Sequence, residues 1–173
     1  MELCQVPGKE MEADISLLVE RHGDTLLRFC YLYLNDLQLA EDAVQETYLK
    51  AHRAYHTFRG ESSERTWLTA IALNCCRSLT RKPWFKQENR AVALENLPEA
   101  SEAFDPGDDT VITEVMKLPP KYREVILLHY YQGLKLREIA GIMSLPEATL
   151  STRLKRARAK LKETLERWYF DED

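Results

Sequence analysis

The stretch that decides the fold runs from Leu136 to Leu154 and reads LREIAGIMSLPEATLSTRL. Its first half carries Ile139, Ala140 and Met143 at helical spacing, which gives an apolar face. Residues 144–146, Ser-Leu-Pro, then interrupt the pattern as a turn would. A second apolar stripe follows at Leu150, Leu154, Ala157, Leu161 and Leu165. The stretch therefore predicts two helices joined by a tight turn, a helix-turn-helix.

The second of these helices carries short polar and long cationic side chains off its apolar stripe. Such groups near the N-terminal half of a helix can reach base edges and phosphates in the major groove of DNA. A solvated basic face on an ordinary bundle helix has the same composition, so the pattern alone leaves both interpretations open. The residues concerned are Ser151, Thr152, Arg153, Lys155 and Arg156.

Charge is segregated along the 173 residues. The chain carries a net charge of −4, but the segment Lys121–Arg167 has 11 basic and five acidic residues, a net of +6. Residues 1–120 carry a net of −7, and the last three residues add −3. A basic C-terminal part behind an acidic front predicts that one part contacts nucleic acid and the other contacts protein.

Outside the helix-turn-helix, apolar residues recur at helical spacing through most of the chain. Residues 11–82 predict three helices, at about 15–33, 37–55 and 64–80, and residues 111–169 predict a second helical unit. In that unit a helix follows Pro119-Pro120 and ends near Gly133, before the helix-turn-helix at 135–143 and 147–168. Residues 83–110 contain Pro, Gly and an acidic run without a basic residue, which favours a flexible linker. We expect an all-α fold of two small helical domains joined by an acidic flexible linker.

Two polar faces stand out in the first unit. Asp42, Gln45 and Glu46 share one side of the second helix, where a solvated face and a carboxylate pair are both possible. No His or further acid is placed to complete such a pair. Asn74, Arg77 and Arg81 share a side of the third helix, which suits either a plain surface stripe or contacts to bases and phosphates.

Several classes of protein are disfavoured. No stretch approaches the roughly 20 apolar residues that span a membrane, and no apolar run follows a basic start, so we expect a cytoplasmic protein. The four cysteines lack CxxC spacing and no paired His accompanies them, so we expect buried thiols and no metal. No phosphate loop or nucleophile–base set appears, so we expect no enzyme activity, cofactor or small-molecule substrate.

Five motifs in order resemble extracytoplasmic-function (ECF) sigma factors of bacterial RNA polymerase. The first domain of that family is matched by Asp42-Ala-Val-Gln-Glu-Thr-Tyr, then Phe58-Arg59-Gly60, then Thr66-Trp-Leu with Ile71-Ala-Leu-Asn74. The second domain is matched by Leu118-Pro-Pro-Lys-Tyr-Arg-Glu-Val and by the helix-turn-helix with Arg153-Leu-Lys-Arg-Ala-Arg-Ala-Lys-Leu. The resemblance covers about residues 12–82 and 111–167.

The resemblance implies roles for these residues. Asp42, Gln45 and Glu46 would bind core RNA polymerase at the basic clamp helices of its largest subunit. The loop and third helix would capture the promoter's minus-ten element, flipping a base into the loop. The helix-turn-helix would recognise the minus-thirty-five element through Ser151, Thr152, Arg153, Lys155 and Arg156, and a membrane-linked anti-sigma factor would hold the protein inactive. The minus-ten residues would be Phe58, Arg59, Ser62, Asn74, Arg77, Arg81 and Lys82.

The sequence also departs from the family pattern. Ser144 stands where the helix-turn-helix usually has Gly, Ala148 replaces another common Gly, and Glu64 and Ser151 replace common apolar and basic residues. Trp84 and Phe85 are not part of the usual motif and could pack on the core, contact an inhibitor or stack on an unpaired base. A stand-alone helix-turn-helix regulator of duplex DNA is the alternative, but it leaves the N-terminal motifs unexplained. We expect the isolated protein to bind promoter duplex weakly, because its acidic front repels DNA.

Overall fold

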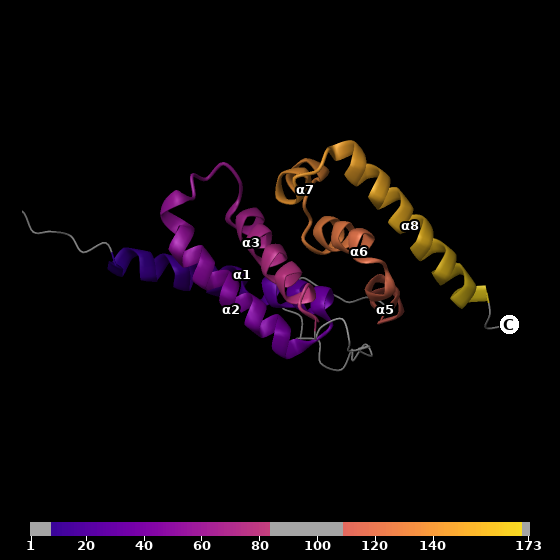
Figure 1. Cartoon of the computed structure of the whole chain (residues 1–173), viewed down its shortest axis with the longest axis horizontal. Coiled ribbons are helices and arrows are strands. Elements are labelled where there is room, and N and C mark those ends of the chain that lie inside the picture. Colours follow the sequence, from indigo (N-terminus) through magenta and orange to yellow (C-terminus); the bar gives the residue numbers. More distant parts are fainter. Residues whose placement is uncertain (1–7, 84–108, 171–173) are drawn as a thin grey trace, which may run out of the picture.

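The computed structural model describes residues 8–83 and 109–170, with side chains described for 15–83 and 111–165. Every regular element within these ranges is helical, which confirms the predicted all-α class (Figure 1). The predicted linker at 83–110, together with Cys4, Trp84 and Phe85, lies almost wholly outside them. The elements are α1 (Gly8–Leu34), α2 (Leu37–Ala54), the 3-10 turn η1 (Tyr55–Thr57), α3 (Glu64–Thr80), α5 (Asp109–Lys117), α6 (Pro120–Ile126), the π-helical η3 (Leu127–Tyr131), α7 (Leu136–Met143) and α8 (Glu147–Phe170).

Helices α1, α2 and α3 pack on one another as the N-terminal helical unit (Figure 1). Side-chain caps set where two of them begin: Asp36 Oδ1 accepts from Leu39 N at 2.7 Å, and Ser63 Oγ accepts from Thr66 N at 3.1 Å. The core of the N-terminal helical unit includes Phe29, Leu68 and Leu73. Three buried free thiols lie in the same core: Cys30, Cys75 and Cys76. Three of the four cysteines therefore act as small core residues, as expected.

Helices α5 to α8 with η3 form the C-terminal helical unit, in which α6 and α7 both pack on α8. Pro120 occupies the start of α6, where its missing N–H costs no hydrogen bond. The helix continues through η3 and ends before Gly133, whose φ is +65°. Both stripes of the helix-turn-helix face the core, since Ile139, Leu150 and Ala157 are fully buried.

The two units lie against each other, with α3 contacting α7 and α1 contacting η3 (Figure 1). Polar side chains make most of the hydrogen bonds across this boundary, as described below. None of the helices in the described ranges is both long and apolar enough to cross a bilayer.

Ser144 ends α7 in the left-handed conformation, with φ 53° and ψ 45°. This geometry lets the N–H groups of Ser144 and Leu145 both reach the carbonyl of Ala140, the latter at 3.2 Å. The turn between the two helices of the motif therefore depends on a backbone conformation that glycine adopts far more readily than serine.

Replacing Ser144 with Gly is expected to raise the free energy of unfolding by about 0.5–1 kcal/mol, because glycine relieves the left-handed strain. Urea denaturation measures the change. Ser78→Gly is the matched control: Ser78 is exposed within α3, where glycine should lower the stability by about 0.5 kcal/mol. A loss of stability in both variants would show that the turn is not strained.

Candidate nucleic-acid interface

The N-terminal half of α8 presents the side chains that the sequence predicted for base and phosphate contacts. Ser151, Thr152, Lys155 and Arg156 are exposed, and Arg153 is half-buried beside them. The apolar stripe on the opposite side fixes this orientation, because Leu150, Leu154 and Ala157 are buried against α6 and α7. The helix thus turns one polar, cationic surface outward at the end nearest the turn.

The cationic surface extends onto α6, which the sequence pattern did not reveal. Lys121 Nζ lies 5.0 Å from the centroid of the Tyr122 ring, and Lys160 Nζ lies 6.0 Å from it. Burial alone would raise the pKa of the Tyr122 hydroxyl, but hydrogen bonds from Arg156 and Lys121 and their charges lower that pKa overall. Only the packing of α6 on α8 brings these residues together, so periodicity within either helix could not have found them.

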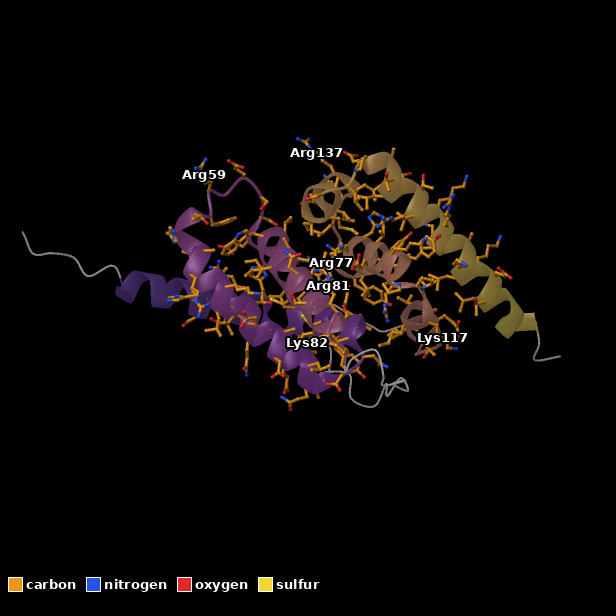
Figure 2. The ribbon with its side chains drawn as sticks, in the orientation of Figure 1. Arg59, Arg77, Arg81, Lys82, Lys117 and Arg137 are labelled. Carbon is orange, nitrogen blue, oxygen red and sulfur yellow. The ribbon has the colours of Figure 1, made fainter. Side chains whose placement is uncertain are left out.

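An aromatic cluster holds the loop between α2 and α3. Phe58 stacks on Trp67 with ring centroids 4.8 Å apart, and Tyr55 meets the edge of Trp67 at 6.2 Å. Gly60 then turns the chain with φ +69°. Arg59 and Ser62 are exposed on this loop, and Figure 2 shows Arg59 at its outer side. Phe58 therefore packs inward while its two neighbours face solvent.

A groove of about 600 Å³ separates this loop and α3 from α7. Ser62 and Trp67 line one wall, and Lys135, Arg137 and Ile142 line the other. The groove places the predicted minus-ten loop next to the first helix of the helix-turn-helix, although the two are far apart in the sequence.

The polar side of α3 divides into two parts. Asn74 is exposed, as are Arg81 and Lys82 just beyond the end of α3 (Figure 2). Arg77, in contrast, is turned toward the C-terminal unit, where its Nε and Nη2 lie 2.9 and 2.8 Å from the two carboxylate oxygens of Glu124. The residues of α3 and its C-terminal end that were predicted to contact the minus-ten element therefore do not form one continuous surface in this conformation.

Glu124 receives a third hydrogen bond, from the hydroxyl of Tyr33 on α1 at 2.6 Å. Burial by itself would raise the pKa of the Glu124 carboxyl, but the hydrogen bonds from Arg77 and Tyr33 outweigh it and lower that pKa. Burial, together with the Glu124 charge, raises the pKa of Tyr33. The carboxylate is thus held ionised in a nearly enclosed position, at 6% exposure.

The acidic face of α2 is accessible. Asp42, Gln45 and Glu46 are exposed, and Leu49 on the same side is 53% exposed. Glu46 pairs with Lys50 at 3.4 Å, a solvent-exposed pair that contributes little to stability. A hollow of about 380 Å³ next to this face is lined by Asp42, Glu46 and residues of α3. An acidic surface with an exposed leucine suits a basic protein partner rather than DNA.

In the part of the chain that the structure describes, no three His, Cys, Asp or Glu side chains gather as metal ligands. The groups on the surfaces described above are donors, acceptors and fixed charges suited to binding.

Comparison with known protein families identifies both helical units. The family model described as Sigma-70 region 2 matches residues 18–85, and the model described as Sigma-70, region 4 matches residues 109–161. The first match contains α2 and α3, and the second contains α6, α7 and most of α8.

Individual relatives are similar over nearly the whole chain. The ECF RNA polymerase sigma factor SigW of Bacillus subtilis is 31% identical over 162 residues, covering 86% of this chain and 87% of SigW. The RNA polymerase sigma-H factor of Pseudomonas aeruginosa is 30% identical, covering 87% and 85%. Among solved structures, CnrH in complex with the cytosolic domain of CnrY is 28% identical with a TM-score of 0.69, covering 90% and 89%. With both sigma-70 regions matched in order and two relatives similar over 87% and 85% of their own length, the chain belongs to the ECF family of RNA polymerase sigma factors.

Proposed function

We propose that this ECF sigma factor binds core RNA polymerase through α2 and directs it to promoters through two DNA contacts. In this proposal, residues 11–82 bind polymerase and open the minus-ten element, residues 83–110 link the two units, and residues 111–169 recognise the minus-thirty-five element. The protein carries out no chemistry of its own, because the nucleotide addition belongs to the polymerase.

The observation that carries the proposal is the outward, cationic N-terminal half of α8 behind a strained, closely packed turn. A helix in this position can enter the major groove, where Ser151, Thr152 and Arg153 would meet base edges. Lys155 and Arg156 would hold phosphates, and the basic residues around Tyr122 would extend that contact.

The minus-ten contact is assigned to the loop and to the exposed end of α3. Arg59 and Ser62 would approach the displaced strand, and Asn74 would meet a base. Phe58 is assigned to holding the loop, because its ring is already stacked on Trp67. Arg81 and Lys82 lie beyond the end of α3, where they would hold the strand backbone.

Regulation by an anti-sigma factor forms part of the proposal. CnrH, which shares this fold and is 28% identical, was solved with the cytosolic domain of CnrY bound. We infer that this chain likewise works in the cytoplasm and is held inactive by a protein partner that is linked to the membrane.

Co-elution with bacterial core polymerase tests the proposal. Wild-type protein is expected to co-elute with core enzyme, and the holoenzyme is expected to produce discrete transcripts from genomic fragments that core enzyme alone does not produce. Binding to duplex DNA at nanomolar concentration without any co-elution would instead support the stand-alone regulator, since such a protein needs no polymerase.

A further inference from the structure

We propose that the free protein closes on itself through an interdomain latch formed by Tyr33, Arg77 and Glu124, and that this latch competes with promoter DNA for Arg77. The inference rests on the proposed function in one respect, the assignment of Arg77 to the promoter strand. The closure itself is a property of the chain alone.

The latch is the tightest of a row of contacts along one side of α3. Glu124 of α6 accepts two hydrogen bonds from Arg77 of α3 and one from Tyr33 of α1, so a single carboxylate joins three helices. Arg77 and Glu124 also form an ion pair, with 2.8 Å between Arg77 Nη2 and Glu124 Oε2. The Arg77 side chain is 25% exposed and the Glu124 side chain is 8% exposed. A bidentate, partly buried pair of this kind is stronger than a surface ion pair.

Two further groups of hydrogen bonds cross the boundary toward the N-terminal end of α3. Gln132 Oε1 accepts from Arg65 Nε and from Thr69 Oγ1, both at 3.4 Å, and Gln132 Nε2 donates to the carbonyl of Thr25 at 3.3 Å. In the second group, Thr66 Oγ1 donates to Glu138 Oε1 of α7 at 3.2 Å. Thr66, Thr69 and Arg77 share one side of α3, and all three contact the C-terminal unit.

The chemistry of this boundary suits opening. Glu124, Gln132 and Thr69 are buried polar groups that water can solvate once the units separate. Boundaries between domains of one chain resemble transient protein interfaces and are more polar than obligate ones. The closed state is therefore held by directional contacts that a stronger competitor can replace.

DNA is such a competitor. The Arg77 guanidinium has five N–H donors, and Glu124 engages its Nε and Nη2. The carboxylate also neutralises the charge that would attract a phosphate, and the Arg77 side chain is only 25% exposed in the closed form. Arg77 therefore attracts the promoter backbone less while the latch is closed, and the apparent affinity of the free protein for DNA falls in proportion to the fraction of molecules that are open.

Distance measurements on the full-length free protein test the closure. Cysteines are introduced at the exposed positions 41 of α2 and 163 of α8 and carry spin labels, whose separation is measured by pulsed electron–electron resonance. Cys4→Ser removes a competing thiol, and the other three native cysteines are buried in the core. Wild type is expected to give one narrow distance. Glu124→Gln should shift the closed-to-open ratio about tenfold or more toward open, since it removes a buried charge-assisted contact. Glu124→Lys should open the protein further, because it places a second positive charge next to Arg77.

The matched control is Glu114→Gln. Glu114 pairs at 2.7 Å with Lys117 of the same helix, so this change removes an equal charge and an ion pair that lies within α5. Its distance distribution should equal that of wild type. The charge exchange Arg77→Glu/Glu124→Arg should restore the narrow distance, which separates loss of the latch from misfolding; circular dichroism checks the helix content of each variant.

Binding of a fluorescent 20-nucleotide single strand provides the functional readout. Glu124→Gln should bind it several-fold more tightly than wild type, whereas the charge exchange should not, because it closes the protein and lacks Arg77. A broad wild-type distance that Glu124→Lys leaves unchanged would overturn the latch. Failure to co-elute with polymerase would overturn the proposed function but leave the distance result standing.

Discussion

Reversing the charge of Asp42 and Glu46 together, by Asp42→Arg/Glu46→Arg, is expected to weaken binding to core polymerase more than a hundredfold. Both carboxylates are exposed on one side of α2, so the reversal creates a basic patch without disturbing the core. If the partner surface is basic, as the proposed function requires, each reversed side chain meets a like charge, and such pairs cost several kcal/mol. Titration of labelled core enzyme at fixed salt measures the loss.

Glu20→Arg/Asp24→Arg is the matched control for this reversal. Both residues are exposed on α1, a different helix from the one that carries Asp42, Gln45 and Glu46. The control changes the net charge by the same amount, so affinity should fall less than threefold if the Asp42 face is the contact. Equal losses in the two variants would show that overall charge, rather than this face, decides polymerase binding.

Removing two cations from α8, by Lys155→Gln/Arg156→Gln, is expected to lower the affinity of the holoenzyme for its promoter about 30- to 100-fold. Each exposed cation that neutralises a phosphate releases a counterion, so the slope of log affinity against log salt should also become shallower by about 2. The promoter is the one recovered by transcribing genomic fragments with the holoenzyme, and binding is followed over a range of salt concentrations.

Lys117→Gln/Lys162→Gln removes the same charge elsewhere on the C-terminal unit. Lys117 lies at the end of that unit remote from α7 and Arg137 (Figure 2), and Lys162 lies about two turns beyond Arg156 on α8. The control should change affinity less than threefold and leave the salt slope nearly as it was. An unchanged slope in the Lys155/Arg156 variant would place the duplex on another surface.

These two experiments and the latch concern different states of one protein. The exposed faces of α2 and α8 are available in the closed form, whereas Arg77 is not. Polymerase could therefore engage α2 first and expose the promoter contacts of α3 afterwards. Weak DNA binding by the free protein, expected from its acidic front, would then have a second and shorter-range cause.

The sequence by itself determined four of the helices and most of the exposed faces. Apolar residues at helical spacing predicted α2, α3, α7 and α8 to within about two residues, because burial of one face leaves a regular period. The same period placed Asp42 and Glu46 outside the core, and Lys155 and Arg156 likewise. Family resemblance, not periodicity, supplied the roles of these faces.

Only the tertiary structure decided which polar residues meet across the chain. Arg77 and Glu124 are 47 positions apart, and Tyr33 and Glu124 are 91 apart, so no local pattern relates them. Periodicity placed Arg77 on the same surface as Asn74. Nothing in the sequence indicated that Arg77 would pair with Glu124 of α6 while Asn74 stays exposed. Hydrophobic burial is encoded locally as a period, but a pairing of polar groups depends on how two finished units dock, and that is fixed only when both have folded.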